Sequence, residues 1–179
     1  MAQLKGKNPG IENITPVGSR GVYATPLGTA VITEQEGFIT AISITDSSSE
    51  DAHYTPGPAT LLAIKQLDEY FAGKRLEFDF PMKPNGTVFQ QEVWRNLLNI
   101  PYGQTMSYAG LSKLMNNPLA IRAIAAANGQ NPLWIVVPCH RVIGSNGSLT
   151  GYAGGLWRKQ WLLEHETKVL GIGQVIMEF

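Results

Sequence analysis

The sequence predicts an α/β (α+β) fold, in which a small N-terminal β-sheet with one helix precedes a mostly helical region. Three patterns support this order. Residues 21–44 contain short runs of β-forming side chains joined by glycine-bearing turns, which is typical of a β-meander. Apolar side chains then recur at helical spacing from Leu61 to Phe71. Prolines and a glycine interrupt the chain at residues 81–86, and helical patterns prevail beyond them.

The N-terminal half is expected to hold three strands, one helix and a further short strand. The three strands cover residues 21–25, 29–33 and 38–44, with turns at 26–28 and 36–37. A polar loop at residues 47–58 leads into a helix that ends at Gly73 and has its apolar positions at Leu61, Ile64, Leu67 and Phe71. Residues 76–80 alternate apolar and polar side chains, which predicts a strand with one buried face.

The C-terminal half is expected to be mostly helical. Thr87 and Gln90 form a capping-box pattern that opens a helix, and Pro-Tyr-Gly at residues 101–103 ends it. Helices at residues 107–115 and 119–128, joined by a turn at 116–118, make a helix-turn-helix pattern. A strand-like run at 135–139, a glycine-rich loop at 144–155 and a last helix at 156–168 follow. We therefore expect a flexible lead-in at residues 1–20, an N-terminal α/β domain at 21–83 and a C-terminal helix-turn-helix domain at 84–179.

Composition limits the function classes. Of the 179 residues, 44% are apolar and 16% are charged, and 14 basic residues balance 14 acidic ones, so any nucleic-acid surface must be a local patch. One cysteine excludes an internal disulfide and fits a reducing compartment. No run approaches the ~18 apolar residues of a membrane span. Residues 1–10 lack the apolar core of a signal peptide, so we expect a cytoplasmic protein without a membrane partner.

The single cysteine, Cys139, is the most informative residue. It follows an apolar run and Pro138, and it precedes His140 and Arg141. Cationic neighbours lower a thiol pKa and so favour the reactive thiolate, although many free cysteines are only small buried hydrophobes. In an extended segment His140 points away from Cys139, but a turn at the strand end can bring them together, directly or through a water.

Other readings of this region are weaker. A zinc site needs several ligands, and one cysteine with three histidines does not supply them, so we expect no metal. The signatures of cysteine hydrolases are absent. Glu166 lies four residues after Leu162 and can share the inward stripe of the last helix, although a solvated glutamate is the default interpretation of that pattern. His165 carries no further signal.

The helix-turn-helix pattern is ambiguous by itself. Residues 119–128 carry a single charged side chain, Arg122, and a run of alanines. Such a helix can approach another surface closely but cannot read many base edges, and core packing explains the alanines equally well.

Taken together, these residues resemble a known family. Pro-Cys-His-Arg-Val at residues 138–142 resembles the active-site signature of the O6-alkylguanine-DNA alkyltransferases. The resemblance extends over residues 87–167, with further matching blocks at 88–94, 100–103, 107–108, 131–132, 152–156 and 161–166. It implies a ribonuclease-H-like N-terminal domain and a winged-helix-like C-terminal domain that carries the active-site cysteine.

The resemblance implies DNA repair by direct reversal. An alkyl group, typically methyl, passes irreversibly and stoichiometrically from O6 of guanine, or from O4 of thymine, to Cys139, without a cofactor. The partner is double-stranded DNA, bound through its minor groove with the damaged base flipped out, and the protein is a monomer. One alternative is a non-catalytic protein that binds alkyl lesions and signals to another repair pathway, although proteins of that kind lack the reactive cysteine that this chain has. Another is a helix-turn-helix regulator.

The resemblance also assigns roles. Cys139 is the nucleophile, His140 takes its proton through a water, and Glu166 holds His140, as in a catalytic triad. Asn131 ties the helix-turn-helix to the active-site strand, and Tyr108 donates a proton or hydrogen bond to the leaving guanine. Arg122 fills the gap left by the flipped base, and the other expected DNA contacts are Tyr108, Ala123, Ala127 and Asn128. The expected pocket residues are Val142, Trp134, Tyr152, Ala153, Gly154 and Lys159.

Overall fold

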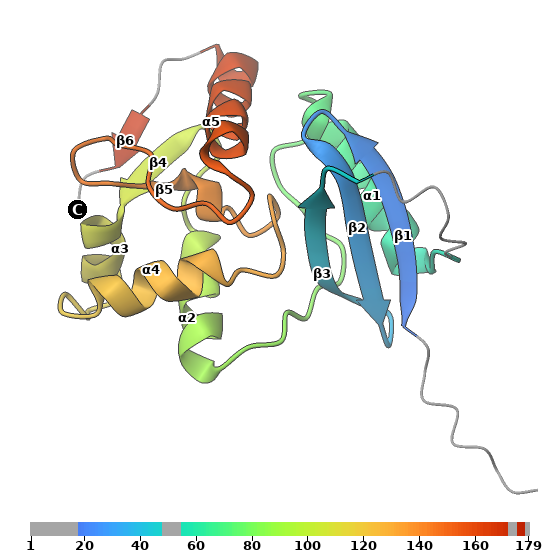
Figure 1. Ribbon diagram of the computed structural model, residues 1–179, viewed down its shortest axis with the longest axis horizontal. Coiled ribbons are helices and arrows are strands. Elements are labelled where there is room, and N and C mark those ends of the chain that lie inside the picture. Colours follow the sequence, from blue (N-terminus) through green and yellow to red (C-terminus); the bar gives the residue numbers. More distant parts are fainter. Residues whose placement is uncertain (1–17, 48–54, 172–174, 178–179) are drawn as a thin grey trace, which may run out of the picture.

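A computed structural model describes residues 18–47, 55–171 and 175–177, and for the last of these segments only the backbone is considered (Figure 1). The expected lead-in therefore lies outside the described residues except for residues 18–20, and residues 48–54 of the expected polar loop also lie outside them.

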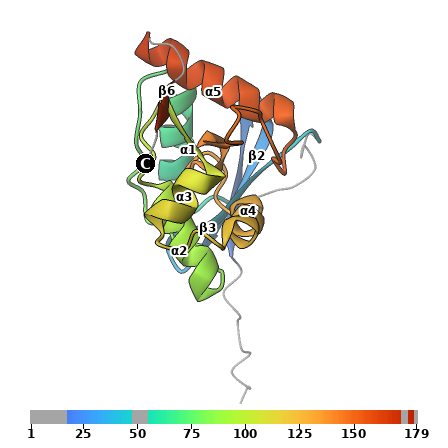
Figure 2. The ribbon, with the colours of Figure 1, turned by 90° about the vertical axis from the view of Figure 1, so that its left-hand side faces the viewer.

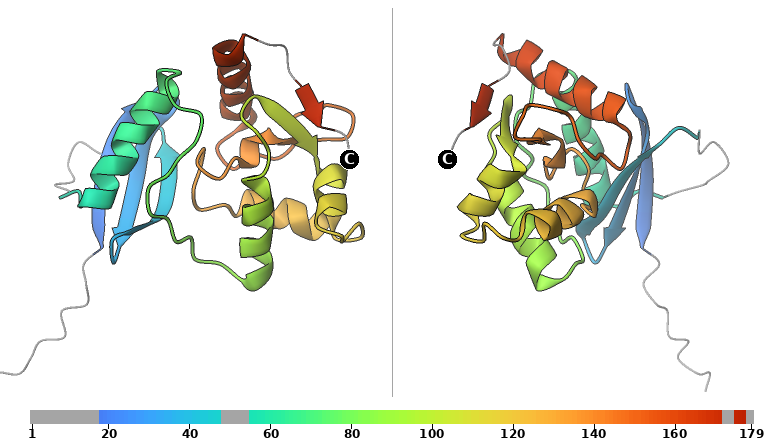
Figure 3. Two further views of the ribbon diagram at one scale, coloured as in Figure 1. Left: turned by 180° about the vertical axis from the view of Figure 1, so that it is seen from behind. Right: turned by 60° about the vertical axis from the view of Figure 1, so that its left-hand side comes forward.

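The N-terminal half is an antiparallel sheet covered by one helix. Strands β1 (Ser19–Thr25), β2 (Gly28–Gln35) and β3 (Phe38–Thr45) pair in chain order, as the meander pattern predicts. Helix α1 (Pro58–Phe71) covers one face of this sheet (Figure 3). Gly28 has a φ of 121° and its Cβ position would lie 2.6 Å from a backbone oxygen of Thr45, so the first turn requires glycine.

The C-terminal half surrounds a short parallel sheet with helices. Its elements are α2 (Val88–Leu97), β4 (Gln104–Ser107), α3 (Tyr108–Leu114), α4 (Ile121–Gly129), the 3₁₀ turn η1 (Cys139–Arg141), β5 (Val142–Ile143), α5 (Leu156–Leu170) and β6 (Val175–Met177). The strand order is β5-β4-β6. The side chains of Thr87 and Gln90 form the expected capping box of α2. The mixed α/β fold with a helix-turn-helix in the second half is confirmed.

The two halves share one hydrophobic core and are joined through the edge of β3. The Ile42 N–H donates to Pro132 O (2.8 Å), and the Trp134 N–H donates to Ile42 O (3.2 Å). Ile39 pairs with the linker in the same way, through Pro81 O at 2.9 Å. Helix α5 lies at one end of the molecule, beside α1 (Figure 2). The sheet edge is thus paired rather than exposed, and it supports the segment that leads to Cys139.

Two predicted strands are wrong. Residues 76–80 form no ladder, because the side chain of Gln66 bonds both the backbone N–H and the carboxylate of Asp79. Residues 135–139 are turns and the start of η1, with Ile135 at a φ of 71°. Their β-branched side chains favour a strand, but the chain instead curls so that Val137 N–H reaches Leu133 O at 2.9 Å.

The register of α1 also differs from the expected stripe. Leu61 is 55% exposed, whereas Tyr70 is completely buried. The sequence pattern also missed β4, which holds the middle of the C-terminal sheet. In the part of the chain that the structure describes, no helix is long and apolar enough to cross a membrane.

Candidate active site

Asn131 shapes the loop that carries the cysteine. Its Nδ2 donates to Val137 O (2.8 Å) and to Leu133 O (3.3 Å), and its Oδ1 accepts from the Leu133 N–H (2.9 Å). The same Nδ2 lies 3.1 Å from Cys139 Sγ. The segment from residue 132 to residue 139 therefore wraps around one buried amide. Through these contacts Asn131, which follows α4, is joined to the segment that carries Cys139.

His140 faces a glutamate on α5. His140 Nε2 and Glu166 Oε1 are 2.7 Å apart, and both side chains are fully buried. An ionised carboxylate only accepts hydrogen bonds, so Nε2 carries the proton and Nδ1 presents a lone pair. His140 Nδ1 has no hydrogen-bond partner among the described residues. A buried imidazole of this tautomer is equipped to accept a proton, and Glu166 is the group that orients it.

Glu166 is surrounded by donors. Its Oε2 accepts from the Gly103 N–H (2.9 Å) and from Arg141 Nε (2.9 Å). Its Oε1 accepts from Arg141 Nη2 (3.0 Å) and from the hydroxyl of Tyr70 (2.8 Å), in addition to His140. Burial alone would raise the pKa of Glu166, but the charges and hydrogen bonds of His140 and Arg141 hold it well below its usual range. The carboxylate is therefore ionised, and it lies on the buried face of α5.

The resting cysteine is a thiol. Burial raises the pKa of Cys139, although the Asn131 hydrogen bond and the charge of Lys159 act in the opposite direction. Burial lowers the pKa of His140 and outweighs the opposing effect of Glu166. The lowered pKa of His140 favours the uncharged imidazole at neutral pH, and Arg141 is engaged by Glu166, so neither offers a free positive charge to the thiol. Because the thiolate is the nucleophilic form of cysteine, any attack by Cys139 requires the loss of this proton.

Lys159 is buried beneath the site. Its Nζ donates to Val142 O (2.6 Å) and to Thr150 O (2.9 Å), and burial lowers its pKa to about 8. The ammonium group links β5 to the loop that follows it. Its charge also favours the thiolate of Cys139.

A depression of about 580 Å³ lies between α4 and the loop at residues 150–153. Its lining includes Tyr108, Arg122, Tyr152 and Ala153, for which the resemblance implies DNA-contact and pocket roles. Burial raises the pKa of Tyr152, and the negative charge of a Cys139 thiolate and a hydrogen bond to it add to this shift, so the tyrosine adjoins the thiol. Tyr152 therefore contacts both the depression and the thiol.

Trp134, Gly154 and Asn128 pack beside the tyrosines that line this depression. The rings of Trp134 and Tyr152 lie 5.6 Å apart between centroids. A Cβ on Gly154 would lie 2.5 Å from the Trp134 ring, so only glycine allows this approach. Asn128 Nδ2 lies 3.3 Å from the Tyr108 hydroxyl and 3.5 Å from Cys139 O, and Asn128 is 2% exposed. The structure thus places Asn128 beside the cysteine.

Helix α4 exposes one face and buries the other. Arg122 and Ala123 are exposed. Ala127 is buried, and its carbonyl accepts a hydrogen bond from Trp94 Nε1 (2.9 Å). The burial of Ala127 and Asn128 argues against DNA contacts by their side chains. Arg122 and Ala123 remain on the face that a duplex can reach.

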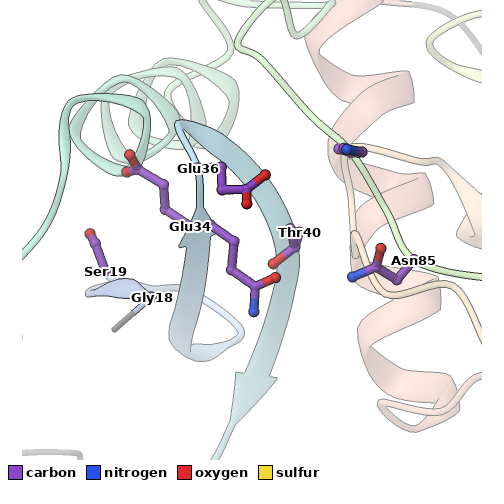
Figure 4. Close-up of a pocket in the computed structure, with 8 residues that line it drawn as sticks. Gly18, Ser19, Glu34, Glu36, Thr40 and Asn85 are labelled. Atoms are coloured by element: carbon purple, nitrogen blue, oxygen red, sulfur yellow. The ribbon is translucent and has the colours of Figure 1, made fainter. Parts of the chain in front are cut away.

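Another hollow, of about 450 Å³, lies between the N-terminal sheet and the linker (Figure 4). Glu34, on its wall, accepts hydrogen bonds from the Thr60 N–H and from the Thr60 hydroxyl, both at 2.8 Å. The carboxylate thus caps the N-terminus of α1, and this structural role accounts for the burial of Glu34. The lining residues supply no thiol and no imidazole. Within the described residues, no group of His, Cys, Asp and Glu could hold a metal ion.

Sequence reasoning missed Arg141 and Tyr70 as partners of Glu166. Arg141 lies within the motif at residues 138–142, but the sequence indicated it only as a neighbour of the thiol. Tyr70 had no sequence signal, because it lies 96 residues from Glu166.

Comparisons with known proteins agree across both halves. Residues 19–84 match the family model described as 6-O-methylguanine DNA methyltransferase, ribonuclease-like domain, and residues 88–168 match the model of the DNA binding domain of the same family. A methylated-DNA–protein-cysteine methyltransferase of Mycobacterium tuberculosis is 45% identical over 145 residues, which cover 79% of this chain and 88% of that protein. The protein of the same name from Shigella flexneri is 45% identical over 161 residues, covering 82% and 94%.

Solved structures show the same likeness. A crystal structure of Mycobacterium tuberculosis OGT in complex with DNA aligns with a TM-score of 0.75 and 44% identity, covering 83% of this chain and 92% of that chain. The O6-methylguanine DNA methyltransferase of Methanococcus jannaschii has a TM-score of 0.62 at 24% identity, covering 89% and 98%. The second likeness concerns the fold alone.

Proposed function

The chain belongs to the 6-O-methylguanine DNA methyltransferase family, and we propose that Cys139 is the residue to which it transfers the methyl group. Its activity is that of a methylated-DNA–protein-cysteine methyltransferase, which repairs DNA by direct reversal. The observation that carries the assignment to Cys139 is the buried chain of contacts from Glu166 to His140 beside the chain's single thiol.

The site supports a displacement assisted by a general base. His140 Nδ1 accepts the thiol proton, directly or through a water, while Glu166 stabilises the imidazolium that forms. Cys139 Sγ then bonds to the alkyl carbon as the carbon–oxygen bond breaks, and the electron pair of that bond leaves with the base. Tyr108 donates a hydrogen bond or proton to the leaving base. The thioether is a poor leaving group, so each molecule reacts once.

The substrate is double-stranded DNA with an alkyl group on O6 of guanine or O4 of thymine. Because Cys139 is 4% exposed, a base must leave the duplex to reach it. The depression lined by Tyr108, Tyr152 and Ala153 is the receiving pocket, and Val142, Trp134, Gly154 and Lys159 support it. Exposed Arg122 fills the vacated stack, while the small residues of α4 approach the minor groove.

We extend the proposal to the oligomeric state and the cellular location of the protein. It acts as a monomer in the cytoplasm, where reducing conditions preserve the single thiol that the reaction consumes. The division into domains at residues 21–83 and 84–179 stays a prediction. The alternative of a lesion-binding protein is disfavoured, because proteins of that kind lack the reactive cysteine that this chain has.

One experiment separates these functions. The protein is incubated with a duplex that contains O6-methylguanine, and its intact mass and a peptide map are recorded. We expect one methyl group per protein, on Cys139, with no further turnover, and none on a Cys139→Ser control. A protein that binds the duplex but stays unmodified would refute the transferase and support a lesion-binding protein instead.

A further inference from the structure

The N-terminal half reaches the catalytic carboxylate through one side chain. Tyr70 lies in the last turn of α1, and its hydroxyl donates to Glu166 Oε1 at 2.8 Å. This is the oxygen that faces His140 Nε2 at 2.7 Å. The hydroxyl is therefore one hydrogen bond away from the imidazole that we assign as the general base.

Two consecutive residues of α5 bind Tyr70, one at its backbone and one at its hydroxyl. His165 Nε2 donates to the backbone carbonyl of Tyr70 (2.9 Å), and Glu166 accepts from its hydroxyl. The ring is fully buried, and the rings of Phe78 and Tyr102 lie 5.6 Å and 5.8 Å away between centroids. Burial and the charge of Glu166 keep the pKa of Tyr70 well above its usual value. The hydroxyl thus stays a donor at every working pH.

We propose that Tyr70 is a positioning residue of the reaction, so that the N-terminal half completes the site by holding Glu166 Oε1 against His140. This inference rests on the proposed transfer to Cys139. A hydroxyl that shares the carboxylate oxygen draws charge from it and fixes its direction. Without the hydroxyl, more negative charge faces the imidazole, which raises the pKa of His140 and leaves Glu166 less well oriented.

Several other charged or titratable groups face this pair. They are Arg141 and Cys139 on η1, Lys159 on α5 and Tyr102 on the loop after α2. A change confined to the hydroxyl of Tyr70 leaves all of them in place. The hydroxyl of Tyr102 is buried and has no hydrogen-bond partner among the described residues, so Tyr102→Phe is a matched control.

The test compares wild type, Tyr70→Phe and Tyr102→Phe. For each protein, the single-turnover rate of methyl transfer from an O6-methylguanine duplex is measured from about pH 5 to about pH 9. The ring nitrogens of His140 are titrated in parallel by ¹⁵N NMR without substrate. We expect Tyr70→Phe to react about 3- to 10-fold more slowly, with its acid limb and the His140 titration raised by about half a pH unit or more. Tyr102→Phe should match wild type in both.

The outcomes are distinguishable. A Tyr70→Phe protein with the wild-type acid limb and the wild-type His140 titration would overturn the inference, even if it melted at a lower temperature, because packing alone would then explain Tyr70. If wild type transfers no methyl group, the proposed function fails, while the NMR titration still tests the coupling of Tyr70 to His140. If Tyr70→Phe does not fold, 3-fluorotyrosine at position 70 takes its place. Its hydroxyl is a stronger donor, so it should lower both the pH of the acid limb and the pKa of His140. Unchanged values of the two would overturn the inference.

Discussion

Replacement of Glu166 by glutamine should both destabilise the protein and disable its base. The carboxylate accepts five hydrogen bonds, whereas a glutamine amide keeps only one acceptor oxygen and has a donor in place of the other. If the amide nitrogen takes the Oε2 position, the Gly103 N–H and Arg141 Nε–H lose their acceptor, and neither can accept in return. If it takes the Oε1 position, His140 must change tautomer to accept from it, and Nδ1 then carries the proton.

The magnitude follows from this geometry. A hydrogen bond to a charged group is worth about 1.5–3 kcal/mol, so two stranded donors cost about 3–6 kcal/mol. This is a large part of a typical unfolding free energy of about 5–15 kcal/mol. We expect the melting temperature to fall by roughly 10 °C or more. We also expect methyl transfer to slow by about 10²- to 10⁴-fold, because the base is lost or is in the wrong tautomer.

Chemical denaturation and single-turnover kinetics check both effects. Glu164→Gln is the control, since Glu164 is exposed on the same helix and its carboxylate accepts a hydrogen bond from the exposed Gln160. That change should alter stability by less than about 0.5 kcal/mol. If Glu166→Gln and Glu164→Gln unfold at the same denaturant concentration, the buried carboxylate does not stabilise the fold and the reasoning fails.

The pH dependence of stability supplies a second check on Glu166. Its pKa in the folded protein lies below the value of about 4.3 in an unfolded chain, so the unfolded chain takes up the proton first as pH falls. The stabilisation is therefore complete above that pH and is lost below it. The difference in unfolding free energy between wild type and Glu166→Gln should shrink below about pH 4.

Three further predictions concern the reaction. Arg122→Ala should slow repair in duplex DNA about tenfold or more while leaving the reaction with free O6-benzylguanine nearly unchanged, and equal losses in the two rates would contradict a role in base flipping. The transfer rate should be level around neutral pH and fall below about pH 6.5, because the pKa of His140 is lowered and only the neutral imidazole accepts the thiol proton; a rate that rises towards acid would exclude His140 as the base. The methylated protein should lose about 1–3 kcal/mol of stability, because Cys139 is buried in a packed site, and calorimetry that shows an unchanged melting temperature would contradict this.

Local signals in the chain were sufficient where one or two neighbouring residues decide the structure. The Thr87 and Gln90 pair predicted the start of α2, because both capping bonds close within one helical turn. The pattern at residues 135–139 predicted a strand where the structure has turns. The preference of β-branched residues for strands is weaker than the four contacts that Asn131 makes to the curled segment. The same contacts place the thiol.

The register of α1 shows why one partner of Glu166 could not be predicted. A helical stripe through Leu61 and Phe71 and a stripe through Ala63 and Tyr70 both satisfy the 3.6-residue period. The choice between them depends on what packs against the helix. In the folded protein α5 and the loop at residues 101–103 adjoin this end of α1, and Tyr70 is the residue buried there.

The sequence by itself determined the order of the helices, the location of the single thiol and, through its resemblance to one family, the chemistry. These depend on neighbouring residues or on short motifs. Only the tertiary structure decided that Tyr70, Gly103 and Arg141 join His140 at Glu166, and that burial raises the pKa of the thiol. The physical reason is that burial and hydrogen bonding in this cluster join residues 25 to 96 positions apart, and no local preference reports on such contacts.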